Sequence, residues 1–311
     1  MTKLAFGRIV TAMITPFDHN LNVDLKKAAQ LARHLVKNGT DAVLVNATTG
    51  EAPVMSTAEK LDLLEAVKNE VGDEVPVICG TGTNCTKATA DFSQEAEKHG
   101  ADAILVVAPY YNKPPQDAII EHFRIAAGSV KVPVIAYNIP GRTGIEIKPD
   151  TLRVIAEIPN VVAVKESLPS LEPISALSAS LEGLDMKYAA GYEKFVGDRP
   201  MEIYSGDDSS VLPSLSVGAV GVVSVTSHVA GPLMKEMIEA YFAGNVRRAK
   251  ELHLRLYPLF TGLFAVANPI LIKAALRLQG IDAGGLRMPL REAHADEISK
   301  LGEVMKKAGI L

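Results

Sequence analysis

The chain has 311 residues, of which 48% are hydrophobic and 22% charged, and its formal net charge is -4 at pH 7. This mildly acidic composition argues against nucleic acid and anionic membrane surfaces as partners. The two cysteines, Cys79 and Cys85, are too few for a disulfide framework and too isolated for a zinc site, which suits a reducing cytoplasm. There is no apolar stretch of membrane-spanning length and no secretory signal. We therefore expect a cytoplasmic protein.

Short apolar runs alternate with amphipathic stretches through the first three quarters of the chain. Runs of this kind, without alternating polar residues, predict strands that are buried on both faces. The eight predicted strands are residues 9–14, 42–45, 75–79, 103–107, 134–137, 161–165, 202–205 and 221–225.

The stretches between these runs have the apolar spacing of helices. Ser56 and Glu59 predict a capping box, and Gly39 and Gly100 predict helix ends. Strands that alternate with helices predict a (β/α)8 TIM barrel of the α/β class. A doubly wound sheet would need a glycine-rich loop after the first strand, which the chain lacks. The predicted helices are 25–38, 58–71, 87–99, 118–129 and 150–158.

The last quarter of the chain is purely helical in pattern, and a barrel needs only one helix there. We expect a barrel domain at 1–230 and a C-terminal helical region at 231–311, which includes the last barrel helix. Residues 181–200 lengthen the interval before the seventh strand, so we interpret them as an insertion. The predicted C-terminal helices are 232–242, 246–266, 269–278 and 293–307.

Lys165 closes the sixth apolar run. Burial of an ammonium group is costly unless it is paired or loses its proton. A neutral amine in a pocket is a nucleophile for carbonyl compounds. The alternative is that Lys165 marks the point where the strand reaches solvent, and this run alone leaves the two interpretations equally open.

Hydroxyl and cationic side chains follow several of the predicted strands. In (β/α)8 barrels such residues meet at the catalytic face. No histidine is among them, which disfavours a Ser-His-Asp hydrolase and a His-ligated metal site, and we expect neither a metal nor another cofactor. After the seventh strand, Asp207 and Asp208 favour helix capping over cation binding. The strand-end side chains are Thr48, Thr49, Tyr110, Tyr111, Tyr137, Arg142 and Lys165.

These residues suit one reaction type. A deprotonated Lys165 would attack the ketone of a 2-oxo acid and form a Schiff base, from which an enamine nucleophile follows. Tyr137 could transfer protons, and Thr48, Thr49 and Tyr111 could relay them.

Arg142 suits bidentate binding of a second carboxylate. Each side chain also has a structural explanation. Arg142 could be a solvated loop residue, Tyr137 a strand end, and Thr48 and Thr49 turn formers. Their joint occurrence at consecutive strand ends favours the catalytic interpretation.

Six motifs resemble the family of pyruvate-dependent class I aldolases that includes dihydrodipicolinate synthase and N-acetylneuraminate lyase. The resemblance covers nearly the whole chain. Arg142 is typical of the synthase branch, because the sugar-acid lyases lack it. The motifs are TTGE at 48–51, PYYNKP at 109–114, YNIPGRTG at 137–144, KES at 165–167, SGDD at 205–208 and GVVSV at 221–225.

The resemblance implies catalytic roles for four residues. Lys165 would form the Schiff base with pyruvate, and Tyr137 would be the proton donor and acceptor. Thr48 and Tyr111 would complete a proton relay, with Tyr111 reaching across from a neighbouring subunit.

It also implies substrate-binding roles for four further residues. Thr49, Val223 and Gly206 would bind substrate, and Arg142 would receive the carboxylate of L-aspartate 4-semialdehyde. The implied reaction condenses that aldehyde with pyruvate in lysine and diaminopimelate biosynthesis. The implied assembly is a homotetramer, a dimer of dimers.

Two other functions stay open at this point. The first is a lyase that cleaves N-acetylneuraminate or 2-oxo-3-deoxygluconate, which shares the chemistry of Lys165 and Tyr137. The second is a non-catalytic ligand-binding barrel.

Lysine-inhibited family members bind lysine in a cleft at the dimer interface. Asn84 and Tyr110 match this possible allosteric cleft, and Lys60 would repel the lysine ammonium group. We therefore expect weak or absent feedback by lysine. The positions that depart from the family pattern are Ala52, Thr57, Lys60 and Ala88.

Overall fold

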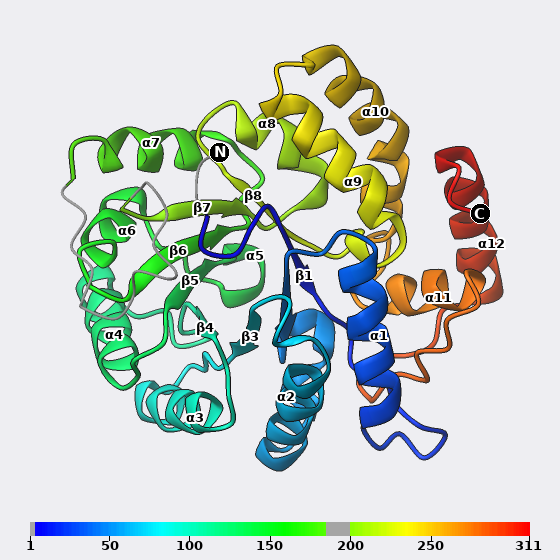
Figure 1. The fold of residues 1–311 in the computed structure, drawn as a ribbon. Coiled ribbons are helices and arrows are strands. Elements are labelled where there is room, and N and C mark those ends of the chain that lie inside the picture. The colour runs from blue at the N-terminus through cyan, green and yellow to red at the C-terminus, as the bar shows by residue number, and fades with distance from the viewer. Residues whose placement is uncertain (1–3, 185–199) are drawn as a thin grey trace. The chain divides into compact units, whose positions relative to one another are not determined.

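The computed structural model describes residues 4–184 and 200–311. Its strands form a closed parallel barrel in which they follow one another in chain order (Figure 1). The (β/α)8 prediction is therefore confirmed. The strands are β1 (Ile9–Ala12), β2 (Ala42–Val45), β3 (Val77–Gly80), β4 (Ala103–Val107), β5 (Val134–Asn138), β6 (Val161–Glu166), β7 (Glu202–Ser205) and β8 (Gly221–Ser224).

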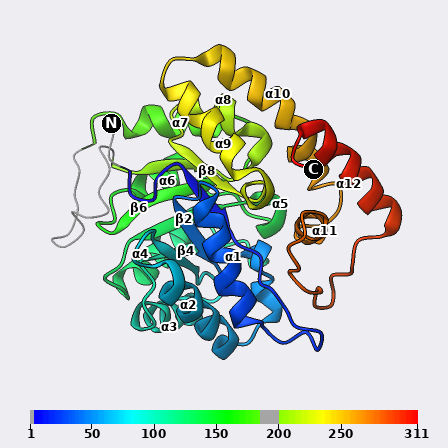
Figure 2. The same ribbon diagram turned by 45° about the vertical axis from the view of Figure 1, so that its right-hand side comes forward.

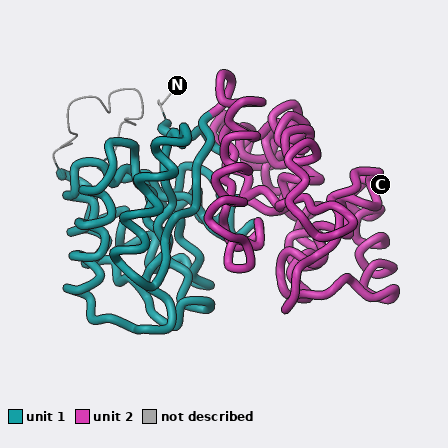
Figure 3. Tube along the Cα trace, turned by 90° about the horizontal axis from the view of Figure 1, so that it is seen from below, with its two compact units in different colours: residues 1–8, 76–223 teal, residues 9–75, 224–311 magenta. Residues whose placement is uncertain are grey.

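Two compact units divide the chain (Figure 3). Of the described residues, those within 1–8 and 76–223 form unit 1, and those within 9–75 and 224–311 form unit 2. The predicted boundary after residue 230 is a different division, and it stays a prediction.

Unit 1 contains most of the barrel strands and the helices that connect them. Every residue of β5 and β6 is buried, as the apolar runs predict. The short helix α5 was not predicted, because Pro140-Gly141-Arg142-Thr143 contains too few apolar residues for a helical period. The helices are α3 (Thr86–Lys98), α4 (Gln116–Gly128), α5 (Pro140–Thr143), α6 (Pro149–Ile155), α7 (Glu172–Leu181) and α8 (Val211–Leu215).

The ladder between β5 and β6 is irregular near its start. Val134 pairs with Val161, but the next residue, Ile135, pairs with Ala163. Val162 is therefore an extra residue on β6, as in a β-bulge. Beyond the bulge the register is regular and ends with Asn138 opposite Glu166.

Unit 2 contains β1, β2 and the C-terminal helices, of which Figure 2 shows α10 beside α9. The predicted capping box is present, since Glu59 N donates to Ser56 Oγ at 3.3 Å and Ser56 N donates to Glu59 Oε2 at 2.8 Å. Helix α10 packs against α9 and α12. The helices are α1 (Leu25–Lys37), α2 (Thr57–Val71), α9 (Ser227–Phe242), α10 (Val246–Gly262), α11 (Ile270–Leu278) and α12 (Ala295–Ala308).

Some predicted boundaries were wrong by a few residues. Helix α9 begins at Ser227 rather than at 232, with a break in helical geometry at Ala230. Helix α10 ends at Gly262 rather than at 266. Apolar pattern identifies the continuous part of a helix better than its first and last turns.

Most of the predicted insertion at 181–200, from 185 to 199, lies outside the described residues. In the described residues, no helix has both the length and the apolar character needed to cross a membrane.

Candidate active site

Lys165 and Tyr137 face each other on adjacent strands. They are register partners on β6 and β5, and the Lys165 amine lies 4.1 Å from the centre of the Tyr137 ring. Both side chains are buried, with Lys165 only 6% exposed. Because β6 continues to Glu166, Lys165 does not mark the point where the strand reaches solvent. The amine of Lys165 and the phenol of Tyr137 are therefore held together in a buried site.

Tyr204 is the partner of Lys165 on the other side of β6. Its hydroxyl lies 2.9 Å from Gly7 O and 2.8 Å from Glu202 Oε2, and its single proton is shared between these two acceptors. Tyr204 therefore links β7 to the N-terminal segment. The Tyr204 hydroxyl is committed to these contacts, whereas the Tyr137 hydroxyl has no hydrogen bond to another described residue.

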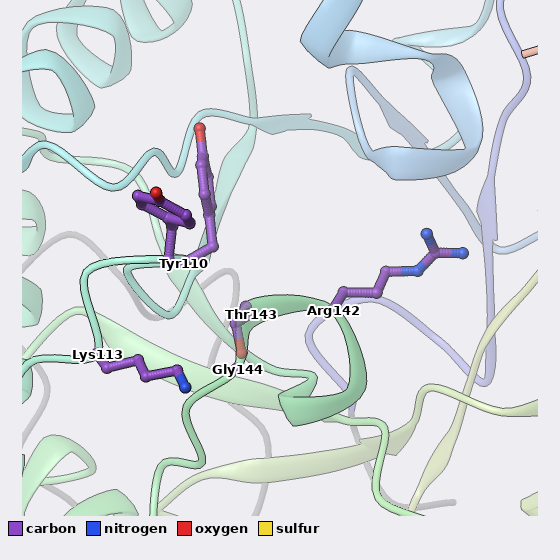
Figure 4. Close-up of a pocket in the computed structure, with 6 residues that line it drawn as sticks. Tyr110, Lys113, Arg142, Thr143 and Gly144 are labelled. Atoms are coloured by element: carbon purple, nitrogen blue, oxygen red, sulfur yellow. The ribbon is translucent and has the colours of Figure 1, made fainter. Parts of the chain in front are cut away.

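Arg142 lines a pocket of about 640 Å³ in unit 1. Figure 4 shows the Arg142 side chain extending away from Tyr110 and Lys113. Within the described residues neither Arg142 nor Lys113 has a carboxylate partner, so the pocket suits an anionic ligand. Lys113 lies in the PYYNKP motif, but no local pattern predicts that it lines this pocket. The lining residues are Tyr110, Tyr111, Lys113, Arg142, Thr143 and Gly144.

The backbone around Arg142 is fixed at both ends of α5. Pro140 begins this one-turn helix, and Gly144 ends it with a φ of 73°. The single proton of the Thr143 hydroxyl has two acceptors in reach, Ile139 O at 3.0 Å and Ile145 O at 2.7 Å. Arg142 is thus a long side chain on a short, well-anchored turn.

Tyr111 belongs to the same pocket, but its side chain is 87% exposed. Its φ of 70° is unusual for a residue with a side chain. Tyr111 N donates to Thr143 O at 3.0 Å, which joins the loop after β4 to α5.

Asn138 and Glu166 follow the Tyr137–Lys165 pair. Asn138 Nδ2 donates to Glu166 Oε2 at 3.0 Å, and both side chains are buried. Burial raises the pKa of Glu166 from 4.5 to about 8, and the charge of Glu146 adds to this effect, while the Asn138 hydrogen bond opposes it. The KES motif contained Glu166, but no role was predicted for it. Strand alternation directs it away from the face that Lys165 occupies.

Gly206 lies against the backbone that follows β6. Gly206 N donates to Glu166 O at 2.6 Å. A Cβ atom at this position would come within 1.8 Å of Ser167 Oγ, so the approach requires glycine. Nearby, Asp207 caps the turn Asp208–Ser210 by accepting from Ser209 N at 2.8 Å, as predicted.

Thr48 and Thr49 lie in unit 2, in the short helix η1 (Thr48–Gly50). Asn268 Nδ2 donates to Thr49 Oγ1 at 2.8 Å. The next residue of the TTGE motif, Glu51, forms an ion pair with Lys273. Asn268 and Lys273 were missed, because they come from the distant C-terminal region and no local pattern distinguishes them.

The structure also places three other predicted site residues, Val223, Asn84 and Tyr110. Val223 is buried in β8. Asn84 and Asn112 exchange hydrogen bonds, with Asn112 Nδ2 donating to Asn84 O at 2.7 Å, and Tyr110 lies in the Arg142 pocket. The role of Asn84 and Tyr110 in lysine binding stays a prediction. In the part of the chain that the structure describes, no three His, Cys, Asp or Glu side chains converge as metal ligands would.

A parallel (β/α)8 barrel with a buried lysine amine against a tyrosine ring at neighbouring strand ends has the architecture of a Schiff-base-forming lyase. The family is shown by comparison: residues 5–308 match the model of the dihydrodipicolinate synthetase family, and the chain belongs to this family.

Full-length relatives define the activity. The 4-hydroxy-tetrahydrodipicolinate synthase of Desulforamulus reducens is 44% identical over 312 residues, which is 100% of both chains. That of Symbiobacterium thermophilum is 45% identical over 307 residues, 98% of this chain and 99% of the relative. The structure of the Cyanidioschyzon merolae enzyme with lysine bound is similar with a TM-score of 0.90 at 40% identity, covering 99% and 100% of the two chains. The chain is an enzyme of lysine and diaminopimelate biosynthesis, a lyase with 4-hydroxy-tetrahydrodipicolinate synthase activity.

Proposed function

We propose that Lys165 is the Schiff-base residue of this synthase and that its substrates are pyruvate and L-aspartate 4-semialdehyde. The observation that carries the proposal is the buried Lys165 amine, 4.1 Å from the Tyr137 ring centre. The amine adds to the ketone carbon of pyruvate, and loss of water gives the Schiff base. Loss of a methyl proton then gives an enamine, whose terminal carbon attacks the aldehyde carbon. The amino group of the condensed substrate finally displaces Lys165 and closes the ring.

Each of these steps moves a proton, and Tyr137 is the proposed donor and acceptor. Its hydroxyl has no hydrogen bond to another described residue, so it is not committed to a structural contact. Thr48 and Tyr111 are the proposed relay that returns protons to Tyr137, as the family motifs imply.

Arg142 is proposed to bind the carboxylate of L-aspartate 4-semialdehyde. A planar guanidinium binds a carboxylate through two parallel hydrogen bonds, and Arg142 has no competing carboxylate among the described residues. Lys113 adds positive charge to the same pocket. This arrangement favours the synthase reaction over cleavage of a neutral sugar chain.

Pyruvate itself needs smaller, close-fitting groups. Thr49, the Val223 backbone and Gly206 are proposed to bind it. Gly206 lies one hydrogen bond from the end of β6, which keeps it beside the strand that carries Lys165.

We further propose a homotetramer in the cytoplasm. The 87% exposed Tyr111 side chain on a left-handed backbone is the feature that favours a neighbouring subunit, since strained exposed residues of this kind are retained for function. Sedimentation analysis tests the assembly. A monomer with full activity would contradict the role of Tyr111 from a neighbour.

Borohydride reduction in the presence of pyruvate tests the central proposal. We expect one stable adduct, assigned to Lys165 by peptide mapping. The Lys165→Ala variant should give none, and Lys131→Ala, which removes an exposed lysine, should react as the parent does. An adduct on another lysine would overturn the assignment. Turnover of pyruvate with the semialdehyde, set against cleavage of N-acetylneuraminate and 2-oxo-3-deoxygluconate, tests the substrates.

A further inference from the structure

A second register pair lies directly beyond the pair that carries the chemistry. Asn138 is opposite Glu166, one residue after Tyr137 and Lys165 on the same two strands. Since side chains alternate between the faces of a sheet, Asn138 and Glu166 point away from the face on which Lys165 meets Tyr137. Asn138 is fully buried and Glu166 is 3% exposed.

Asn138 closes the loop that carries Arg142. Its Nδ2 donates to Ile147 O at 3.1 Å, and its Oδ1 accepts from Ile147 N at 2.9 Å. Residues 139–147 therefore leave β5 at Asn138 and return to the Asn138 side chain. The one-turn helix α5, with Arg142 on it, lies inside this closed loop.

Glu166 fixes the orientation of the Asn138 amide. A primary amide has two N–H donors, and one of these serves Ile147 O while the other serves Glu166 Oε2. The main chain adds two bonds: Ser167 N donates to Asn138 O at 2.9 Å, and Gly206 N donates to Glu166 O at 2.6 Å. The pair thus joins the ends of β5, β6 and β7 to the Arg142 loop.

We propose that Asn138 and Glu166 are positioning residues that set the place of Arg142 relative to Lys165, and so control binding of the second substrate. The proposal rests on the proposed function, because it assigns Arg142 to the carboxylate of the aldehyde. Neither residue touches a reacting atom. Their effect passes through the Ile147 main chain to the loop and through β6 to the lysine.

Glu166 acts here as a hydrogen-bond acceptor and not as a charge. Its other oxygen, Oε1, is buried without a hydrogen-bond partner among the described residues. A buried carboxyl with one free oxygen is favoured in the neutral form. Glutamine has the same shape and presents a carbonyl oxygen to the Asn138 amide. The structure therefore predicts that Glu166→Gln preserves the positioning and that Glu166→Leu does not.

Comparing the KM for the semialdehyde with the KM for pyruvate in variants of the pair tests the proposal. For Glu166→Leu and Asn138→Leu we expect the KM for the semialdehyde to rise at least about tenfold. The reason is that a small misplacement of a substrate-binding group such as Arg142 weakens binding strongly. The KM for pyruvate and the rate of borohydride trapping at Lys165 should change less than about threefold. For Glu166→Gln all three values should stay within about threefold of the parent.

Asn160→Leu is the matched control. Asn160 is also buried and uses its amide to bond two backbone carbonyls, Ala127 O at 2.8 Å and Val130 O at 3.4 Å, but it precedes β6. It should lower the melting temperature without raising the semialdehyde KM selectively. If the leucine variants fail to fold, Asn138→Ser, which shortens the side chain and loses the Ile147 bonds, gives the same comparison.

Three outcomes would overturn the proposal. These are an equal loss of pyruvate trapping and semialdehyde binding in folded variants, an unchanged semialdehyde KM, or a Glu166→Gln variant as impaired as Glu166→Leu. Failure of the proposed function is separate, because it would appear as a parent enzyme that gives no pyruvate adduct or does not turn over the semialdehyde.

Discussion

Lys273 and Glu51 form an ion pair in which neither side chain is exposed to solvent, with Lys273 Nζ 2.7 Å from Glu51 Oε1. Lys273 also donates to Gly285 O at 2.7 Å, and Glu51 Oε2 accepts from Arg287 N at 2.9 Å. Glu51 has a left-handed φ of 56° and directly follows η1, which contains Thr48 and Thr49. The pair therefore holds the TTGE segment within unit 2.

Removing one member of this pair should be more costly than removing both. Lys273→Met leaves an uncompensated buried carboxylate, which costs about 3–5 kcal/mol of unfolding free energy. Adding Glu51→Gln removes that charge and keeps an acceptor for Arg287, so the double variant should be more stable than Lys273→Met. Urea unfolding measures the difference.

A partly exposed ion pair in the same unit gives the control. Lys235 Nζ lies 3.0 Å from Asp41 Oδ1, and the Lys235 and Asp41 side chains are 39% and 25% exposed. Lys235→Met should cost less than about 1 kcal/mol. If Lys273→Met costs no more than this, the buried pair does not stabilise the TTGE segment.

Tyr137→Phe separates catalysis from folding. Loss of the phenol should lower kcat by about 10²–10⁴-fold, since general acid–base groups contribute in that range. The melting temperature should hardly change, because the hydroxyl has no hydrogen bond to another described residue. Stopped-flow turnover and thermal unfolding measure the two effects. A stable variant with normal kcat would remove Tyr137 from the mechanism.

Arg142→Lys should retain charge but lose bidentate geometry. We expect the semialdehyde KM to rise by about tenfold, and by about a hundredfold in Arg142→Ala, consistent with loss of charged hydrogen bonds. Pyruvate trapping at Lys165 should be unaffected. Arg153→Ala on α6 removes a partly exposed arginine that does not line the Arg142 pocket, and it should leave both values unchanged. A uniform loss of pyruvate and semialdehyde binding in Arg142→Ala would contradict the assignment.

The raised pKa of Glu166 predicts a pH-dependent stability. Folded Glu166 holds its proton up to about pH 8, whereas an unfolded glutamic acid releases it near 4.5. Between these values the folded state binds more protons, so this group lowers stability as the pH rises, by at most about 1.4 kcal/mol per pH unit. The effect is constant below 4.5 and above 8. Glu166→Gln should remove it.

Urea unfolding of the parent and Glu166→Gln at pH 6, 7 and 8 checks this sign. Other titrating groups contribute equally to both proteins, so the difference isolates Glu166. The parent should lose stability relative to the variant over this range. Parallel curves would mean that Glu166 is already ionised in the folded protein.

Feedback by lysine should be weak or absent. Lys60 lies on α2, and its ammonium group would repel that of lysine. Initial rates at sub-millimolar lysine measure this effect. Strong inhibition there would contradict the prediction, and a Lys60→Ala variant with increased inhibition would support its cause.

The barrel was predictable because its strands are buried on both faces and so read as unbroken apolar runs. The apolar pattern predicted that β6 ends at Lys165, one residue too early. Glu166 is part of the strand and buried, but a charged residue type does not extend an apolar run. The positions of Lys165 and Tyr137 near strand ends, and of Arg142 just after one, were predictable because apolar runs end there, while their roles stay proposals.

The supporting contacts were not predictable in this way. Asn138 meets Glu166, and Glu51 meets Lys273, only after distant segments have folded together. A sequence pattern records local spacing, whereas these pairs depend on register between strands and on packing of the C-terminal helices. The sequence therefore predicts candidate reactive residues, whereas their contacts with distant residues emerge only from the structure.

The extra residue at Val162 has a consequence for chemistry. Without the bulge, Ile135 would pair with Val162, and Tyr137 would then stand opposite Val164. Asn138 would meet Lys165, and the Tyr137–Lys165 alignment would be lost. The extra residue near the start of β6 therefore sets the register that places the Lys165 amine opposite the Tyr137 phenol near the ends of the two strands.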